Sequence, residues 1–278
     1  MRAGERRWGG WRQPVAIAVT IVFLLPLWFL LAGSLREPGT PPPRTPELLP
    51  RPVSTTSYDR AFELVDLGRY ALNSLALAAV TVPIAVLVAS WAGFALLLLG
   101  RRLRLVLLAA SFAALMIPVT ALLVPRFTLY RWLGVIDTWI PLVAPALLGL
   151  TPFYVLLYHW SFRRLPRDIL DAARLEDMTP FAVWRRVAMP LVRPVTAAIA
   201  LLAFIASWGN FVEPLVYLFD ADRFTLPLGL RALSVLDRTN YPVLLAGAVV
   251  ATAPVVLAFA IAQRFFLHED RGAGWLGR

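Results

Sequence analysis

Residues 72–99 read LNSLALAAVTVPIAVLVASWAGFALLLL, a stretch without a single charged side chain. A helix needs about 20 apolar residues to cross the hydrocarbon core of a bilayer, so this stretch is long enough to span and to tilt. The bilayer interior has no water to satisfy exposed backbone groups, and a helix satisfies them within one segment. The stretch therefore predicts a membrane-spanning helix.

Five further stretches have the same character. Together they predict an all-α integral membrane protein with six transmembrane helices, at Val15–Leu35, Leu72–Leu99, Leu105–Pro125, Trp139–Trp160, Val195–Phe219 and Val243–Phe266. The composition agrees, because 59% of the residues are hydrophobic and 16% are charged, against about 45–50% and about 25% in soluble domains. The predicted organisation is an N-tail (1–13), a first helix with a proline-rich outer loop (14–69), a permease core of helices two to six (70–267) and a C-tail (268–278). Within the outer loop, Thr56–Leu67 predicts a short amphipathic helix.

The residue types that are missing exclude several functions. The chain has no cysteine, and its 27 basic residues are all arginine. This rules out thiol nucleophiles, thiolate metal sites, Schiff-base lysines and the lysine of a phosphate-binding loop. With only two histidines, we expect no metal site, no catalytic residue and no cofactor bound by this chain.

The distribution of arginine predicts the orientation. The N-tail, the second and fourth loops and the C-tail hold 17 arginines and 7 acidic residues, whereas the other loops hold 10 arginines and 9 acidic residues. Cytoplasmic loops of membrane proteins carry the excess of basic residues, so both termini are expected in the cytoplasm. This also accounts for the net charge of +10 without a nucleic-acid partner.

The loop between the fourth and fifth predicted helices, Ser161–Pro194, is the most informative polar segment. Its pattern predicts a helix–turn–helix at the membrane surface, in which Pro166 opens the first helix and Thr179-Pro180 caps the second, which Pro190 ends. Small residues, Ala172-Ala173, would let a partner approach closely. The alternative is a solvated hairpin that only connects two helices.

Two segments of this loop carry a family resemblance. Residues 171–177 (DAARLED) and 187–190 (VAMP) resemble the Glu-Ala-Ala … Gly … Ile-x-Leu-Pro loop of ABC importer permeases of the binding-protein-dependent (type I) class. Five other segments resemble the carbohydrate branch of that class, in particular the maltose-type second permease subunit: 73–75 (NSL), 116–118 (MIP), 207–211 (SWGNF), 225–230 (TLPLGL) and 263–266 (QRFF).

The resemblance implies partners and a docking site. The partners are a homologous second permease, two ATP-binding subunits that hold ATP and Mg²⁺, an extracytoplasmic solute-binding protein and membrane lipid, in the inner membrane of a bacterium. The loop would be the coupling-helix loop that docks on an ATPase subunit, through Asp171, Ala172, Ala173, Arg174, Asp177, Met178 and Pro190. The chain departs from the family in having Asp171 for glutamate and Asp177 for the glycine of the turn, where a positive φ is expected. Aspartate is one of the few other residues that tolerate this conformation.

A second group of polar residues suggests the substrate path. Glu213 is the one acidic residue deep in a predicted span, and such a charge is a functional hypothesis by default. Ser207, Trp208 and Asn210 lie within about a turn of it, and Asn73 opens the second helix. Glu213 could bind sugar hydroxyls or pair with an arginine of the partner permease. The alternative for the whole group is a polar patch that holds helices together.

The sequence thus predicts a permease subunit, not an enzyme, for import of a sugar or oligosaccharide. Two alternatives remain open at this point. The same architecture could import a non-sugar solute, or the chain could be an ion-coupled secondary transporter with Glu213 at its centre.

Overall fold

The computed structural model describes residues 11–45, 47–149 and 151–267, except the side chains of 12, 167, 174 and 265–267. Over these residues the secondary structure is helical, without a strand. The chain divides into two compact units, Met1–Gly68 with Gly229–Ala253, and Arg69–Leu228 with Pro254–Arg278. Each unit is considered by itself.

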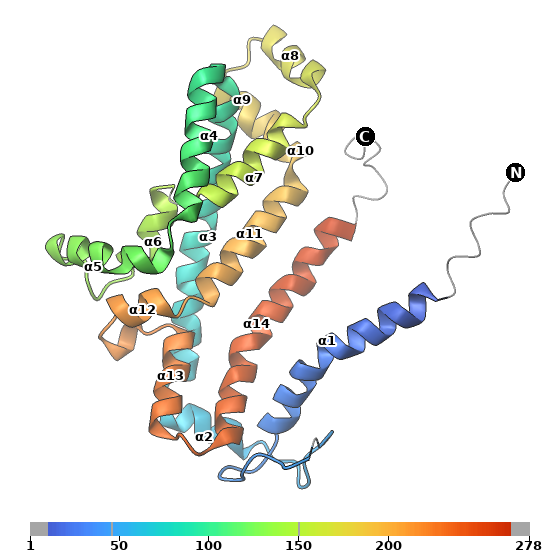
Figure 1. The fold of residues 1–278 in the computed structure, drawn as a ribbon, viewed down its shortest axis with the longest axis vertical. Coiled ribbons are helices and arrows are strands. Elements are labelled where there is room, and N and C mark those ends of the chain that lie inside the picture. The colour runs from blue at the N-terminus through green and yellow to red at the C-terminus, as the bar shows by residue number, and fades with distance from the viewer. Residues whose placement is uncertain (1–10, 46, 150, 268–278) are drawn as a thin grey trace, which may run out of the picture. The chain divides into compact units, whose positions relative to one another are not determined.

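The helices follow one another with short connections, apart from the proline-rich loop of residues 35–55 between α1 and α2 (Figure 1). They are α1 (Arg12–Ser34), α2 (Thr56–Leu64), α3 (Leu67–Leu98), α4 (Arg101–Met116), α5 (Leu123–Trp132), α6 (Ile140–Leu147), α7 (Pro152–Arg163), α8 (Arg167–Leu175), α9 (Pro180–Val183), α10 (Met189–Leu191), α11 (Arg193–Trp208), α12 (Val212–Tyr217), α13 (Leu226–Leu236) and α14 (Tyr241–Leu267). Short 3₁₀ turns lie at Val119–Leu122 and Ala221–Arg223, and a π-helical turn lies at Trp184–Ala188. The predicted helix in the outer loop is present as α2.

By length and apolar composition, four helical segments of the described chain can cross a membrane. They are Gln13–Ser34, Leu67–Leu98, Ile140–Arg163 and Tyr241–Arg264. Two bent helix pairs, Arg101–Met116 with Val119–Trp132 and Pro180–Leu191 with Arg193–Trp208, raise the number to six if each pair is one span. The bends measure 90° and 86°.

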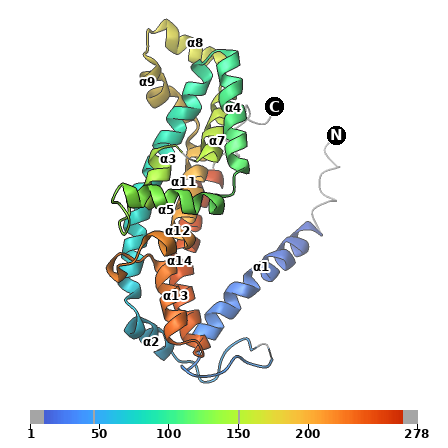
Figure 2. The same ribbon diagram turned by 60° about the vertical axis from the view of Figure 1, so that its left-hand side comes forward.

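Two of the predicted spans differ from the structure, and prolines and a glycine explain why. The span expected at Leu105–Pro125 stops at Met116, since Ile117 is extended with ψ 118°, as a residue before proline prefers. The chain then turns away into α5 (Figure 2). The span expected at Val195–Phe219 ends at Trp208, and the helix restarts only at Val212.

The core of the second unit lies where α3 crosses α7. A Cβ atom on Gly93 would lie 2.7 Å from the Cβ of Tyr158 and 3.0 Å from the carbonyl oxygen of Val155. The two helices therefore meet at a contact that only glycine allows, which is the typical way of packing helices in membranes. Next to it, the rings of Phe94 and Phe162 pack edge to face with centroids 5.5 Å apart.

The first unit is joined by hydrogen bonds between distant segments. The backbone N–H of Gly39 donates to Oδ1 of Asn240 at 2.9 Å, and the Ser57 hydroxyl donates to the carbonyl oxygen of Arg36 at 2.6 Å. Trp28 Nε1 donates to the carbonyl oxygen of Leu48 at 2.8 Å. These bonds hold the proline-rich loop at the ends of α1 and α2.

Candidate functional site

The loop after α7 folds into the predicted helix–turn–helix. Helix α8 ends in a turn in which the N–H of Met178 donates to the carbonyl oxygen of Ala173 at 3.2 Å, with Asp177 at φ +51°. This is the geometry of a helix end closed by a left-handed residue, normally glycine. The hydroxyl of Thr179 then accepts a hydrogen bond from the N–H of Ala182 at 3.3 Å, with Pro180 in the first turn of α9. Asp177 therefore adopts the positive φ expected of the family glycine.

The structure separates the predicted docking residues into two groups. Asp171, Ala172 and Asp177 are exposed, as is Pro190, whereas Ala173 is only 6% exposed and belongs to the core. Met178 is half-buried. Arg174 lies in α8, but its side chain is outside the described part. Of the two adjacent alanines, only Ala172 is thus available to a partner.

The exposed side of the loop also carries apolar side chains that the sequence analysis did not single out. Leu175 is 88% exposed, and Ile169 and Phe181 are exposed as well. Large apolar side chains open to solvent on a polar loop indicate a contact surface. We call Ile169, Ala172 and Leu175, which follow one another at intervals of three along α8, the loop face. The ring of Phe181 instead packs against Trp91 and Trp184, with centroids 6.3 and 5.4 Å away.

The other side of the loop is fixed to the transmembrane helices. Trp184 is buried, and its ring packs edge to face on Trp91 of α3 with centroids 5.5 Å apart. Ala173, Val183 and Ala188 join the core around Tyr158 and Phe162 of α7, described above. Packed side chains therefore connect the loop to α3 and α7.

The expected end of the second short helix at Pro190 is wrong. The helix continues to Leu191, and the break falls at Val192, with φ −102° and ψ 21°. A π-helical turn explains the continuation, because the N–H of Met189 donates to the carbonyl oxygen of Trp184, five residues back. This wider turn accommodates a proline that an α-helix interior would not accept.

A second polar group lies between α5 and the break that separates α11 from α12. Nη1 of Arg126, on α5, donates to Oε1 of Glu213 at 3.1 Å, and Nδ2 of Asn210 donates to Oε2 of Glu213 at 2.7 Å. The side chains of Arg126 and Glu213 are only 17% and 15% exposed. The arginine partner of Glu213 within the chain is thus its own Arg126, and Glu213 opens the first turn of α12.

Ser207 and Trp208 do not share one helical face with Asn210 and Glu213, because the helix is interrupted between Trp208 and Val212. Trp208 is 4% exposed, and its ring stacks on Phe204 with centroids 5.7 Å apart. Ser207 is half-buried at the end of α11. Asn73 donates to the carbonyl oxygens of Asp222 and Phe224 at 2.9 and 3.0 Å, so it binds the following loop.

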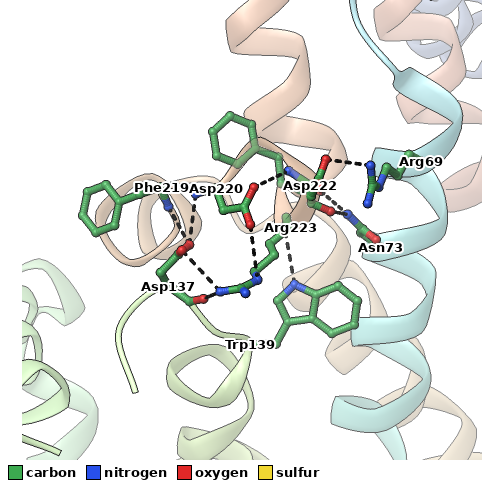
Figure 3. Close-up of polar contacts among 9 residues, drawn as sticks. Arg69, Asn73, Asp137, Trp139, Phe219, Asp220, Asp222 and Arg223 are labelled. Atoms are coloured by element: carbon green, nitrogen blue, oxygen red, sulfur yellow. Dashed lines mark hydrogen bonds and ion pairs between the residues drawn. The ribbon is translucent and has the colours of Figure 1, made fainter. Parts of the chain in front are cut away.

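That loop, residues 218–225, is held by a dense polar network (Figure 3). Oδ1 of Asp137 accepts hydrogen bonds from the N–H groups of Phe219 and Asp220 at 2.9 and 3.0 Å. Arg223 donates to the carbonyl oxygen of Asp137, and Trp139 Nε1 donates to the carbonyl oxygen of Arg223 at 3.1 Å. On the other side, the ion pair between Arg69 and Asp222 measures 2.6 Å. The network fixes a loop that composition alone would leave flexible.

Asp137 gives this network a pH dependence. The backbone N–H groups of Phe219 and then Asp220 lower the pKa of Asp137 below its ordinary value, and Arg223 adds to the effect. The stabilisation of the loop is therefore complete above the ordinary pKa of aspartate and is lost as the pH falls through the lowered value. At neutral pH, Asp137→Ala should raise hydrogen-exchange rates of the Phe219 and Asp220 amides at least about tenfold, since each loses its acceptor.

Exchange followed by mass spectrometry measures this effect. Asp220→Ala is a matched control, because its carboxylate accepts from Asp222 N–H and does not bind the two amides. Unchanged protection in Asp137→Ala would mean that the loop is held without the carboxylate.

Sequence reasoning missed Arg126 and Asp137, which were counted only as loop charges. Their partners lie 87 and 82 residues further along the chain, so no local pattern connects them. A weak signal for Asp137 was available, since aspartate is one of the residues that tolerate a positive φ, and Asp137 has φ +59°.

Comparisons with known proteins agree with this architecture. The family described as "Binding-protein-dependent transport system inner membrane component" matches residues 81–272. The chain is 32% identical over 262 residues to the "Arabinooligosaccharides transport system permease protein AraQ" of Halalkalibacterium halodurans, covering 92% of this chain and 93% of that protein. It is 28% identical to the "Trehalose transport system permease protein SugB" of Mycobacterium tuberculosis, covering 94% and 95%.

A solved structure shares the fold. A chain of a bacterial ABC transporter involved in the import of the acidic polysaccharide alginate matches with a TM-score of 0.72, at 19% identity, over 96% of this chain and 99% of that chain. Among the described residues, no group of three or more His, Asp or Glu side chains could hold a metal ion. The chain belongs to the family of inner membrane components of binding-protein-dependent transport systems, and it is a multi-pass membrane permease subunit rather than an enzyme.

Proposed function

We propose that this chain forms, with a homologous second permease, the translocation path of an ATP-driven importer for a sugar or oligosaccharide. The observation that carries the proposal is the loop after α7, which has an exposed apolar face on one side and a buried connection to α3 and α7 on the other. The relatives AraQ and SugB, whose printed names refer to arabinooligosaccharides and trehalose, support a carbohydrate substrate.

In this proposal the loop face, together with Asp171, Asp177 and Arg174, docks on one of two separate ATPase subunits that hold ATP and Mg²⁺. Small and apolar side chains permit close approach, and the charged residues around them select the partner. Closure of the ATPase subunits on ATP would move the loop, and the core around Trp184 would pass that motion to α3 and α7.

The orientation follows from the arginine distribution. The loop face lies in the arginine-rich set of loops, so we place it and both termini in the cytoplasm. We take each bent pair as one span, which gives six spans and, like any even number, places both termini on the same side. Residues 70–267 are the proposed permease core, and the loop at 218–225 then lies outside, where a solute-binding protein would deliver the substrate.

The proposed substrate path includes the polar group around Glu213. Helices that break in the membrane free backbone and side-chain groups to bind a solute near the break. Asn210 and Glu213 lie at such a break and offer amide and carboxylate groups that can bind sugar hydroxyls. Arg126 keeps the carboxylate paired in the absence of substrate. In this proposal Asn73 holds the loop at 218–225, and Trp208 holds the end of α11.

The test is uptake into proteoliposomes that contain this chain, its second permease, the ATPase subunits and the binding protein. We expect ATP-dependent uptake of a labelled di- or oligosaccharide, with no uptake when the ATPase subunits are omitted. A panel with a polyamine and a phosphonate tests the non-sugar alternative. Uptake driven by a proton or sodium gradient without ATPase subunits would instead identify an ion-coupled transporter.

A further inference from the structure

The end of the second unit that carries α8 and α9 contains a cavity whose arginines have no part in the proposed function. Its volume is about 720 Å³, within the range of about 300–1,000 Å³ typical of small-molecule sites. The cavity lies between the ends of α3, α4 and α7 and the loop formed by α8 and α9, which occupy one end of the unit (Figure 1).

Its lining combines apolar walls with an arginine cluster. The apolar walls are formed by Phe94, Leu97, Leu105, Leu108 and Phe162, among others. Three arginines also line it: Arg101 and Arg104 of α4, and Arg163 in the last turn of α7. Arg101 and Arg104 lie three residues apart, so they project from one face of the helix.

These arginines are not neutralised within the described chain. None of the three makes an ion pair or side-chain hydrogen bond with another described side chain or backbone group. Asp171, the one acidic residue in the described lining, is engaged in another interaction of the chain. With three arginines against one aspartate, the described lining carries a net positive charge beside apolar walls.

The depth of the cavity favours a lipid over a protein segment as its occupant. Leu105 and Leu108 lie in the apolar part of α4, below the arginines at its start, and no residue of α4 is buried within the chain. A hydrocarbon chain can lie along such a wall while its headgroup meets the arginines. Basic pockets between transmembrane helices on the cytoplasmic side have the chemistry that binds anionic headgroups.

We propose that this cavity binds an anionic phospholipid, with the headgroup phosphate on Arg104 and Arg163 and an acyl chain along Leu105 and Leu108. The lipid would contact the ends of α4 and α7 on one side and α8 on the other, on the membrane side of the loop face. The inference rests on the proposed cytoplasmic position of the loop.

Native mass spectrometry of the purified transporter complex tests it, with phosphatidylglycerol and phosphatidylcholine of identical acyl chains as probes. The wild type should retain phosphatidylglycerol and not phosphatidylcholine. Arg104→Gln/Arg163→Gln should weaken phosphatidylglycerol binding roughly 30-fold, from about 1 kcal/mol for each basic residue near an anionic lipid. The matched control is Arg102→Gln/Arg164→Gln, which removes the same charge two residues before Arg104 in α4 and one residue after Arg163 at the end of α7, from side chains outside the cavity.

Three results would overturn the inference. The first is equal loss of lipid in both double variants, which would indicate only general surface attraction. The second is the same selectivity for soluble glycerol phosphate, which would indicate a free-anion site. The third is release of the lipid when the ATPase subunit binds, which would make the cavity part of the docking site. Co-purification of the ATPase subunit from the same preparations reports separately on the proposed function, so the two can fail independently.

Discussion

Ala172→Arg is expected to leave the permease folded but to abolish its association with the ATPase subunit, whereas Ala173→Arg is expected to prevent folding. Ala173 is 6% exposed and packs in the core with Val183 and Trp184. An arginine there would be a buried, unpaired charge, which costs at least about 3–5 kcal/mol. Ala172 is exposed on the adjacent position of α8, so an arginine there remains solvated and obstructs only a partner.

The measurement is thermal unfolding and monodispersity of each purified variant, followed by co-purification with the ATPase subunit and the second permease. For Ala172→Arg we expect an unchanged Tm, retention of the second permease and at least a tenfold loss of ATPase subunit. Ala172→Ser is the matched control and should behave as the wild type. Leu175→Asp tests the same surface by a different change, because it replaces the most exposed apolar side chain of the loop face with a negative charge. Wild-type ATPase binding by both Ala172→Arg and Leu175→Asp would refute docking at this face.

Breaking the ion pair between Arg126 and Glu213 is the second large effect that we expect. Removing one member of a fully buried pair costs about 3–5 kcal/mol because the other charge loses its partner. Since these side chains are 17% and 15% exposed, we expect about 2 kcal/mol for Glu213→Leu or for Arg126→Met. Both single variants should also lose most ATP-dependent uptake.

The double variant Arg126→Met/Glu213→Leu separates a structural role from a role in the substrate path. Removing both charges leaves no unpaired charge, and only the amide of Asn210 loses its acceptor, so most of the lost Tm should return. If Glu213 binds substrate, uptake stays low although stability is restored. Recovery of both Tm and uptake would show that the pair only holds α5 against α12. The exposed pair Arg60–Glu63 is the control, and its removal should change stability by less than about 1 kcal/mol.

Local physics made several features predictable from the sequence. Apolar length identified the four helical segments that can cross a membrane. The proline and threonine signals placed the start of α8 and the cap of α9 close to where the structure has them. The positive φ of Asp177 followed from the residue types that tolerate it. These features depend only on neighbours in the chain.

Features that depend on distant contacts were not predictable. The inward position of Ala173 and the outward position of Ala172 are set by the packing of α8 against the π-helical turn at Trp184–Ala188, and a pair of alanines in the sequence does not show which one faces inward. The spans expected at Leu105–Pro125 and Val195–Phe219 ran past the breaks at Ile117 and Gly209, because apolar length alone marks no end within a continuous apolar stretch. The partner of Glu213 was missed because hydrogen bonds across 87 residues leave no spacing rule in the sequence.

The π-helical turn at Trp184–Ala188 has a consequence for how this loop can change over evolution. A π turn holds one residue more than an α turn, so deleting one residue there would restore an α-helix and rotate the preceding segment by about 100°. Trp184 would then point away from Trp91, and α8 would present a different side to its surroundings. The length of this stretch should therefore be kept among related permeases even where its residues differ, and single-residue insertions or deletions should be confined to other loops.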